Sequence, residues 1–133
     1  MNMKDTAKVV KLKGVVSTYS GNGRKLGYPT ANIKAQTKLA DGVYFGFAKL
    51  GKFVDRPALI FIGTPTTVGD RDRRVEAHLL DIPDADYYGA ELELNILQFH
   101  RPNQTFGTVD ELIKHMKQDE KAGRQWFESR GLA

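Results

Sequence analysis

Hydrophobic and polar residues alternate in several short segments of this chain, as they do in β-strands with one buried face. The pattern predicts strands over residues 9–19, 42–50, 57–62, 74–81 and 91–100. Gly51 and Lys52 suit a hairpin turn, and Pro57 is expected at the beginning of its strand, where a missing N–H group does least damage. In the last segment the alternation changes phase near Ile96, which predicts a β-bulge.

One helix is predicted close to the C-terminus. Thr108 and Glu111 form the T-x-x-E of a capping box, and apolar residues follow at helical spacing as far as Phe127. The middle of this segment, residues 117–121, is polar, and Gly123 is unfavourable in a helix. We therefore expect a helix that lies across a barrel surface and is anchored at its two ends. Short strands separated by turns, with a single helix, favour a closed or nearly closed β-barrel.

The composition is that of one globular domain, because 41% of the 133 residues are hydrophobic and 27% are charged. We expect this domain to span residues 1–133, with residues 1–7 as a flexible N-terminus. The absence of cysteine excludes disulfides and cysteine metal sites. No apolar run is long enough to cross a bilayer and the N-terminus lacks an apolar signal segment, so we expect a cytoplasmic protein with no membrane partner. We also expect a monomer.

The net charge of +4 would attract any polyanion, whether a nucleic acid or a nucleotide. The basic residues are dispersed rather than gathered in one run. We interpret two groups of them as solvated charge, namely Lys8, Lys11 and Lys13 along the first strand and Arg71, Arg73 and Arg74 in a loop.

A glycine-rich segment supplies the first candidate site. Glycine lets the backbone approach an anion closely, and neighbouring cationic side chains add attraction. The residues of this phosphate-binding hypothesis are Gly21, Gly23, Arg24, Lys25 and Gly27. Their spacing matches neither a P-loop nor the dinucleotide fingerprint. From spacing alone, a flexible surface loop followed by a proline turn is the simpler interpretation.

The next few residues form a candidate metal site. Pro29 fixes the entry into a short extended run, in which successive side chains point to opposite sides. Thr30 and Asn32 therefore project to the same side and bring two neutral oxygens together. Such a pair suits Mg²⁺, which completes its octahedron with water and phosphate oxygens.

The segment Leu26–Asn32 closely resembles the Pro-Thr-Ala-Asn signature of riboflavin kinases. Further blocks resembling that family follow in the family's own order, and together they cover the chain from about Lys13 to Trp126. These blocks are Gly42–Tyr44, Ile62–Gly63, Pro65–Thr66, Val75–Asp81, Tyr88–Gly89, Arg101–Pro102, Phe106 and Asp119.

The resemblance implies a mostly β fold, a six-stranded Greek-key β-barrel with a C-terminal α-helix. It also implies transfer of the γ-phosphoryl group of ATP to the 5′-hydroxyl of riboflavin, which yields FMN and ADP. The implied cofactor is Mg²⁺ or another divalent ion. In the family, the signature to which Pro29 belongs serves the metal and the nucleotide, and this role carries over to Thr30 and Asn32.

The catalytic base is the second role that the resemblance implies. Glu76 and His78 lie on one face of their strand, and from the alternation alone a solvated glutamate is the simpler interpretation. The resemblance instead places Glu76 at the family's base position. The three histidines show no paired metal-ligand spacing, so we interpret each as structural or exposed.

Arg101 and Phe106 belong to a loop that the family uses on the flavin side of its site. Phe106 is equally suited to a hydrophobic staple, because it lies two positions ahead of the cap residue Thr108. Three places differ from the family's usual pattern: Thr18–Tyr19, Thr67 and Asn103.

Two alternatives remain at this point. One is a small basic β-barrel that binds nucleic acid through stacked aromatics, with the candidates Tyr44, Phe45, Phe47 and Phe53. Core packing explains these aromatics more simply, so we expect no nucleic-acid partner. The other is a barrel that binds flavin or FMN and has lost the kinase step.

Overall fold

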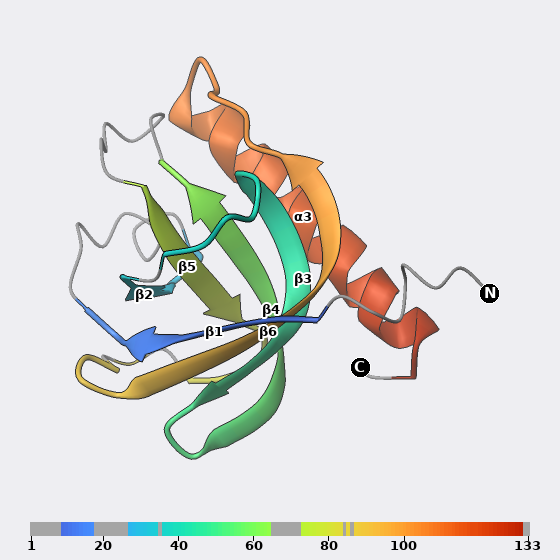
Figure 1. Cartoon of the computed structure of the whole chain (residues 1–133). Coiled ribbons are helices and arrows are strands. Elements are labelled where there is room, and N and C mark those ends of the chain that lie inside the picture. The colour runs from blue at the N-terminus through green and yellow to red at the C-terminus, as the bar shows by residue number, and fades with distance from the viewer. Residues whose placement is uncertain are drawn as a thin grey trace.

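The computed structural model describes residues 9–17, 27–34, 36–64, 73–83, 85 and 87–131. They form six strands and one long helix (Figure 1). The strands are β1 (Val10–Val15), β2 (Ala31–Ile33), β3 (Gly42–Leu50), β4 (Phe53–Gly63), β5 (Arg74–Leu79) and β6 (Glu91–Pro102), and the helix is α3 (Val109–Ser129). Every segment in which alternation predicted a strand contains one. Within the described ranges, no helix is both long and apolar enough to cross a membrane.

The strands form a single antiparallel sheet in the order β1-β6-β3-β4-β5-β2. Strands β3, β4 and β5 are successive neighbours, and β6 returns to lie beside β3, which is the Greek-key arrangement. The sheet curls until its edge strands meet, where the Ser17 N–H donates to the Asn32 carbonyl at 2.9 Å. The structure thus confirms the predicted mostly β fold with six strands and a C-terminal helix.

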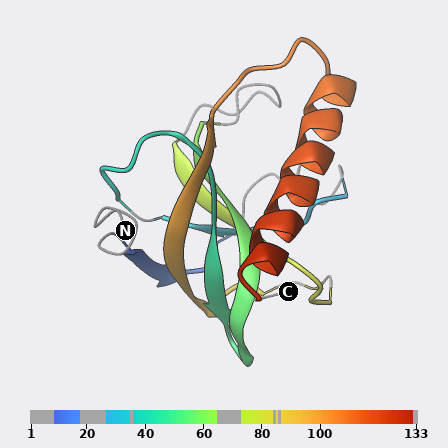
Figure 2. The same ribbon diagram turned by 90° about the vertical axis from the view of Figure 1, so that its right-hand side faces the viewer.

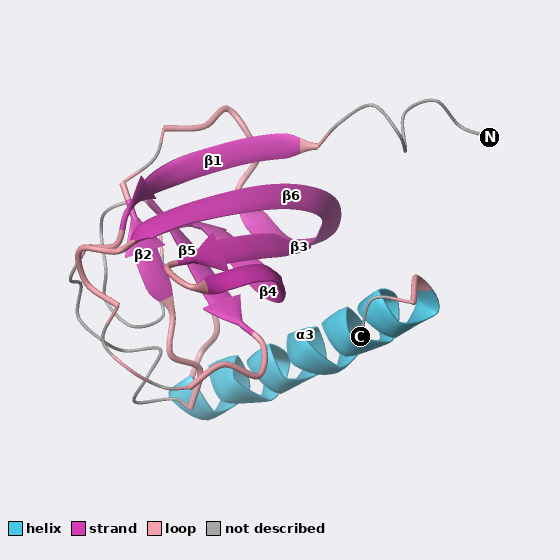
Figure 3. Ribbon diagram, turned by 90° about the horizontal axis from the view of Figure 1, so that it is seen from below, coloured by secondary structure: helices cyan, strands magenta, loops and turns pink. Residues whose placement is uncertain are grey.

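Two hydrophobic clusters explain why β3 and β4 bury residues on both faces. The larger one fills the inside of the curled sheet with residues such as Ile33, Tyr44, Ile60 and Leu92. The smaller one lies between the sheet and the helix and consists of Phe45, Leu59, Leu80 and Phe127. The helix α3 accordingly runs beside β4 on the outside of the sheet (Figures 2 and 3).

The N-terminus of α3 confirms the predicted cap, because the Thr108 side chain accepts a hydrogen bond from the Glu111 N–H at 3.1 Å. The expectation that only the two ends of the helix are anchored is wrong. Asp119, in the polar middle, is 2% exposed and accepts hydrogen bonds from Arg101 at 2.7 Å on both carboxylate oxygens. Gly123 allows close packing, since a Cβ there would lie 2.7 Å from Leu59 Cδ2.

The expected position of Pro57 is also wrong, because β4 begins at Phe53 and Pro57 lies within it. The Pro57 carbonyl accepts from the Leu80 N–H at 2.9 Å, one residue beyond the end of β5. The N–H that proline lacks therefore falls past the end of the β4–β5 ladder and costs no strand hydrogen bond.

Strand β6 contains the predicted bulge. Phe45 and Gly46 of β3 stand opposite Gln98 and Ile96, which leaves Leu97 as the extra residue. A second register shift, which the alternation did not predict, lies between Val43 and Tyr44. Beside each register shift a glycine of β3 faces the β6 backbone closely, since an added Cβ would lie 2.1 Å from the Asn95 carbonyl oxygen at Gly46 and 2.6 Å from that of Arg101 at Gly42.

Gly46 is required by this close approach. A Cβ at position 46 would lie 2.1 Å from the Asn95 carbonyl oxygen, so we expect Gly46→Ala to lower the free energy of unfolding by about 3 kcal/mol. The matched control is Gly107→Ala, whose Cβ would meet only Glu111 Oε2 at 3.8 Å and should change stability by about 0.5 kcal/mol or less. Urea unfolding of the two variants measures the difference, and equal stabilities would contradict the close approach.

Candidate active site

The candidate site lies on the outer face of β2 and β5. These strands pair in a register that sets Asn32 opposite Glu76. Ala31, Ala77 and their neighbours Ile33 and Val75 belong to the interior cluster, so the alternate side chains face outward. Glu76 therefore lies on the face of β5 that is opposite to the interior cluster.

Three of the predicted site residues come together here. The Thr30 hydroxyl Oγ1 donates to Glu76 Oε1 at 3.0 Å, and Asn32 is the register partner of Glu76. The Glu76 side chain is 18% exposed, so the carboxylate is reachable from solvent but shielded on most sides. A hydroxyl, an amide and a carboxylate from segments more than forty residues apart thus share one patch of surface.

Asn32 carries the most unusual polar atom in this patch. The residue is 7% exposed, and its Oδ1 finds no hydrogen-bond partner among the described residues. A buried acceptor without a partner is costly and calls for an unseen water or ion. The neutral oxygens Asn32 Oδ1 and Thr30 Oγ1 therefore fit a divalent ion that takes its other ligands from water and phosphate. No cluster of three histidine or acidic residues suited to a metal occurs in the described part of the chain.

Of the residues predicted for the phosphate loop, Gly27 belongs to the described ranges. Gly21, Gly23, Arg24 and Lys25 lie outside the described residues, and their role stays a prediction. Gly27 has φ +89°, a left-handed conformation that other residues rarely adopt, so glycine is required there by the backbone.

Arg74 corrects the interpretation of its neighbourhood as solvated charge. It lies at the start of β5 with its side chain 5% exposed, and its Nη1 is 3.8 Å from Glu76 Oε1. Arg73 is held by Asp41 at 2.7 Å and by the carbonyl oxygens of Leu39 and Thr37, at 2.7 and 3.2 Å. Arg73 thus fixes the loop after β2, whereas Arg74 adds positive charge beside the candidate base.

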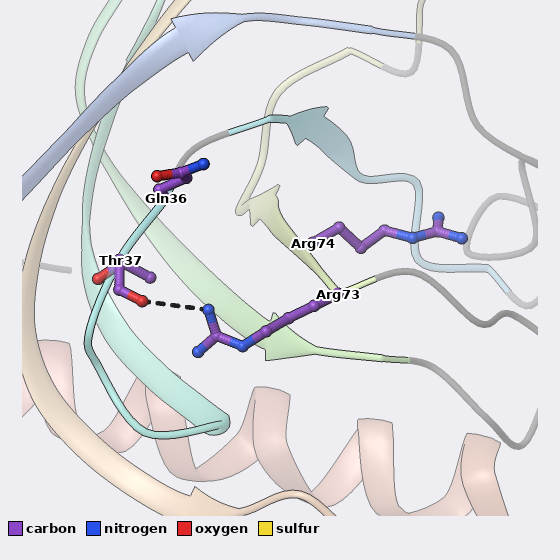
Figure 4. A pocket seen from close by; sticks show the side chains of 4 residues that line it. All are labelled: Gln36, Thr37, Arg73 and Arg74. Carbon is purple, nitrogen blue, oxygen red and sulfur yellow. Dashed lines mark hydrogen bonds between the residues drawn. The ribbon is translucent and has the colours of Figure 1, made fainter.

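An open pocket of about 350 Å³ adjoins the two arginines, and its lining includes Gln36 and Thr37. Figure 4 shows Arg73 reaching toward Thr37, while the Arg74 side chain extends in the opposite direction. The described lining contains no carboxylate, but Arg73 is paired with Asp41 and Arg74 lies beside Glu76, so nearby carboxylates balance much of its positive charge.

The two residues predicted for the flavin side form a second group at the N-terminal half of α3. The Arg101 guanidinium is bound to Asp119 and also donates to the Pro102 carbonyl at 3.1 Å. The centroid of the Phe106 ring lies 4.4 Å from that of the His115 ring. The Arg101 guanidinium lies 5.9 Å from the centroid of the Phe106 ring. These contacts explain both residues as supports of the helix, and their contact with flavin stays a prediction.

Asn103 also has a structural role. Its amide donates to the Ile62 carbonyl at 2.9 Å and so joins the end of β6 to the end of β4. An acidic residue at this position could not donate that hydrogen bond when ionised.

A set of contacts that has no signal in the local sequence pattern joins Tyr28, just before the candidate metal ligands, to α3. The Tyr28 hydroxyl donates to Glu120 Oε1 at 3.0 Å, and burial, helped by this bond, raises the pKa of Tyr28 to about 12. Burial alone would raise the pKa of Glu120, but the hydrogen bonds from Arg124 and Tyr28 hold it below the ordinary value. Arg124 also binds Asp81 at 2.9 and 3.0 Å, and this lowers the pKa of Asp81.

The family follows from comparison with known proteins. Residues 6–127 match the family model of flavokinase, riboflavin kinase, so the chain belongs to the riboflavin kinase family. This confirms the family that the Pro-Thr-Ala-Asn segment indicated.

Named relatives agree with this assignment. The chain is 34% identical to the trifunctional protein RibF/MnmA of Mycoplasmoides gallisepticum, covering 87% of this chain and 18% of that protein. It is 34% identical to the bifunctional riboflavin kinase/FMN adenylyltransferase of Escherichia coli strain K12, covering 79% of this chain and 34% of that protein. The human riboflavin kinase is 25% identical, and the match covers 86% of this chain and 77% of the human protein. The chain therefore spans about a third or less of the first two relatives.

Solved structures support the fold. The crystal structure of a protein from Streptococcus pneumoniae, named as a macrolide-efflux protein, has a TM-score of 0.75 and 29% identity, covering 89% of this chain and 39% of that one. The riboflavin kinase of Trypanosoma brucei has a TM-score of 0.69 and 23% identity, covering 92% of this chain and 82% of that one. The latter likeness shows that the fold is that of a riboflavin kinase.

Proposed function

We propose that this chain transfers the γ-phosphoryl group of ATP to the 5′-hydroxyl of riboflavin, forming FMN and ADP. Membership of the riboflavin kinase family supports this reaction. One observation supports the proposed position of the active site on the molecule. Asn32, whose buried Oδ1 has no hydrogen-bond partner within the described ranges, is the register partner of Glu76, and Glu76 in turn accepts a hydrogen bond from the Thr30 hydroxyl. Phosphoryl transfer asks for little more than a metal site, a group that orients the acceptor hydroxyl, and positive charge.

The hydrogen bond between Thr30 and Glu76 gives each of them a role. A hydroxyl has one proton and two lone pairs, and the Thr30 proton is directed to Glu76 Oε1. Thr30 can therefore offer a lone pair to a metal without breaking this bond. Together with Asn32 Oδ1 it would hold Mg²⁺, which when bound neutralises phosphate charge.

Glu76 is then the base. In our proposal Oε1 stays hydrogen-bonded to Thr30, and the second carboxylate oxygen accepts the proton of the riboflavin 5′-hydroxyl. The transition state of phosphoryl transfer is loose, so the carboxylate needs only to orient the hydroxyl and take its proton late. Arg74, with Nη1 3.8 Å from Oε1, balances the carboxylate charge.

We also propose which residues contact the ATP phosphates and the flavin. The loop containing Gly21, Gly23, Arg24 and Lys25, with Gly27 at its end, would hold the ATP phosphates. Arg101 and Phe106 would close over the flavin from the N-terminal half of α3. A monomer acting in the cytoplasm stays a prediction of the sequence.

The nucleic-acid alternative is disfavoured by burial. Tyr44 and Phe45 are 5% and 3% exposed, so these two rings cannot stack on bases. The barrel that only binds flavin remains as a possible outcome of the test below.

Incubation of the purified chain with riboflavin, ATP and Mg²⁺ tests the proposal, with FMN measured by chromatography. We expect FMN to accumulate, and removal of the divalent ion with EDTA to stop its formation. Flavin binding without FMN formation in the folded protein would instead support the binding barrel. Tight binding to single-stranded DNA near physiological salt, without turnover, would support the nucleic-acid alternative.

A further inference from the structure

Two polar contacts hold the chain immediately before the proposed metal ligands. The His78 ring nitrogen Nδ1 lies 2.7 Å from the Pro29 carbonyl oxygen, and the Tyr28 hydroxyl donates to Glu120 Oε1 at 3.0 Å. The first contact comes from β5 and the second from α3. Neither is explained by the chemistry assigned above to Thr30, Asn32 and Glu76.

The contact to Pro29 shows that the Nδ1 nitrogen of His78 carries a proton. A carbonyl oxygen can only accept, so Nδ1 carries the proton and donates it. His78 lies two residues from Glu76 on the same face of β5. A single strand therefore carries the proposed base and also holds the residue that precedes Thr30.

Tyr28 is also fixed by burial and by its neighbours. The residue is 6% exposed, and its ring packs edge-on against the His78 ring at 5.3 Å. Its acceptor Glu120 also accepts from Arg124 Nε at 2.9 Å, and Arg124 binds Asp81 in the turn after β5. The carboxylate that receives the Tyr28 hydroxyl is thus fixed from both sides.

We propose that Tyr28 and His78 are positioning residues of the phosphotransfer site, and that they bring α3 into the support of its metal ligands. This inference rests on the proposed function. The proline ring fixes φ at position 29, so few free torsions separate the two contacts from Thr30. Mg²⁺ demands near-ideal octahedral geometry, and loss of a residue that orients a ligand typically weakens metal binding by about 10- to 100-fold.

Tyr28→Phe tests the contact to α3, because it removes only the hydroxyl. The matched control is Tyr87→Phe, since the Tyr87 hydroxyl donates to the Pro83 carbonyl at 2.6 Å and Tyr87 has no part in the proposed site. The readouts are Mn²⁺ affinity by electron paramagnetic resonance with a non-hydrolysable ATP analogue, the KM values for Mg-ATP and riboflavin, and the melting temperature. We expect Tyr28→Phe to weaken Mn²⁺ binding by about tenfold and to raise the KM for Mg-ATP, with an unchanged KM for riboflavin. Tyr87→Phe should change none of the three.

His78 is tested by loss and rescue. The amide nitrogen of asparagine can stand where Nδ1 stands, so His78→Asn should retain most of the Mn²⁺ affinity, whereas His78→Leu should lose about 10- to 100-fold. Rescue by asparagine distinguishes the hydrogen bond from simple packing of the ring. Normal Mn²⁺ affinity in both Tyr28→Phe and His78→Leu, with lowered melting temperatures, would show a merely structural role and overturn the proposal.

The same measurements separate this proposal from the proposed function. If the wild-type chain binds Mn²⁺ with the nucleotide but makes no FMN, the kinase assignment fails and the affinities of the variants still decide the role of Tyr28 and His78. If the wild-type chain binds no Mn²⁺ with the nucleotide, both proposals are overturned, because there is then no metal site to position.

Discussion

Asn32→Leu is expected to abolish FMN formation while leaving the protein about as stable as the wild type. Leucine has nearly the shape of asparagine but offers no oxygen to a metal. The buried Oδ1 that it removes has no hydrogen-bond partner among the described residues, so no internal bond is lost there. Exchange of an unsatisfied buried polar group for an apolar one of similar shape is close to neutral, and the free energy of unfolding should change by about 1 kcal/mol or less.

Thr30→Val should have the same effect on turnover with a somewhat larger effect on stability, because it also breaks the hydrogen bond to Glu76. A suitable control is Ser129→Ala, which removes a hydroxyl that donates to the Trp126 carbonyl at 2.8 Å at the C-terminal end of α3 and has no part in the proposed site. Turnover and thermal melting are measured for all three variants. Wild-type turnover in Asn32→Leu or Thr30→Val, with normal melting, would refute the metal assignment.

Glu76→Gln is expected to lower kcat by about 100-fold or more, the usual scale for a lost general base. Glutamine keeps the shape of the side chain and an oxygen that can accept from Thr30, but it cannot take a proton at neutral pH. The KM for riboflavin should therefore change much less than kcat. Steady-state kinetics with riboflavin varied at saturating ATP measure both constants.

The matched control is Glu93→Gln, which alters a glutamate of β6 whose side chain is 44% exposed and lies 3.7 Å from Lys49. Its kcat should equal that of the wild type. If instead Glu76→Gln raises only the KM for riboflavin, Glu76 positions the substrate and the base must be sought elsewhere.

The elements of the fold could be predicted because each depends on local pattern. Alternation located the strands, and the Thr108 capping box located the start of α3. The interior of α3 could not be predicted, because Asp119 is buried against Arg101 and His100, which belong to strand β6 and lie far from it in the local helical pattern. From the sequence, Gly123 is unfavourable within a helix. In the structure, the Leu59 side chain packs where a side chain at position 123 would lie, so glycine is needed there.

The candidate site, too, could be predicted only as far as local pattern reaches. Alternation placed Thr30 and Asn32 on one side of the chain, but only the register of β2 against β5 sets Asn32 opposite Glu76. The hydrogen bond from Tyr28 to Glu120 spans 92 residues and has no local signal. Arg74 follows Arg73 in the sequence and looks like part of a solvated charge run, although Arg74 begins β5, Arg73 precedes it, and the two side chains extend in opposite directions (Figure 4).

Strand β5 is paired to different extents on its two sides. On one side β5 pairs with β4 over six residues, and on the other with β2 over only three. Beyond β2, the described residues add the single bridge between Asn32 and Ser17. Glu76 thus lies on the strand with the longer pairing, while Asn32 lies on the short strand β2. Of the two proposed metal ligands, Thr30 is hydrogen-bonded to Glu76, so a shift of Thr30 toward a larger or smaller ion would disturb the base, whereas a shift of Asn32 would leave that bond intact.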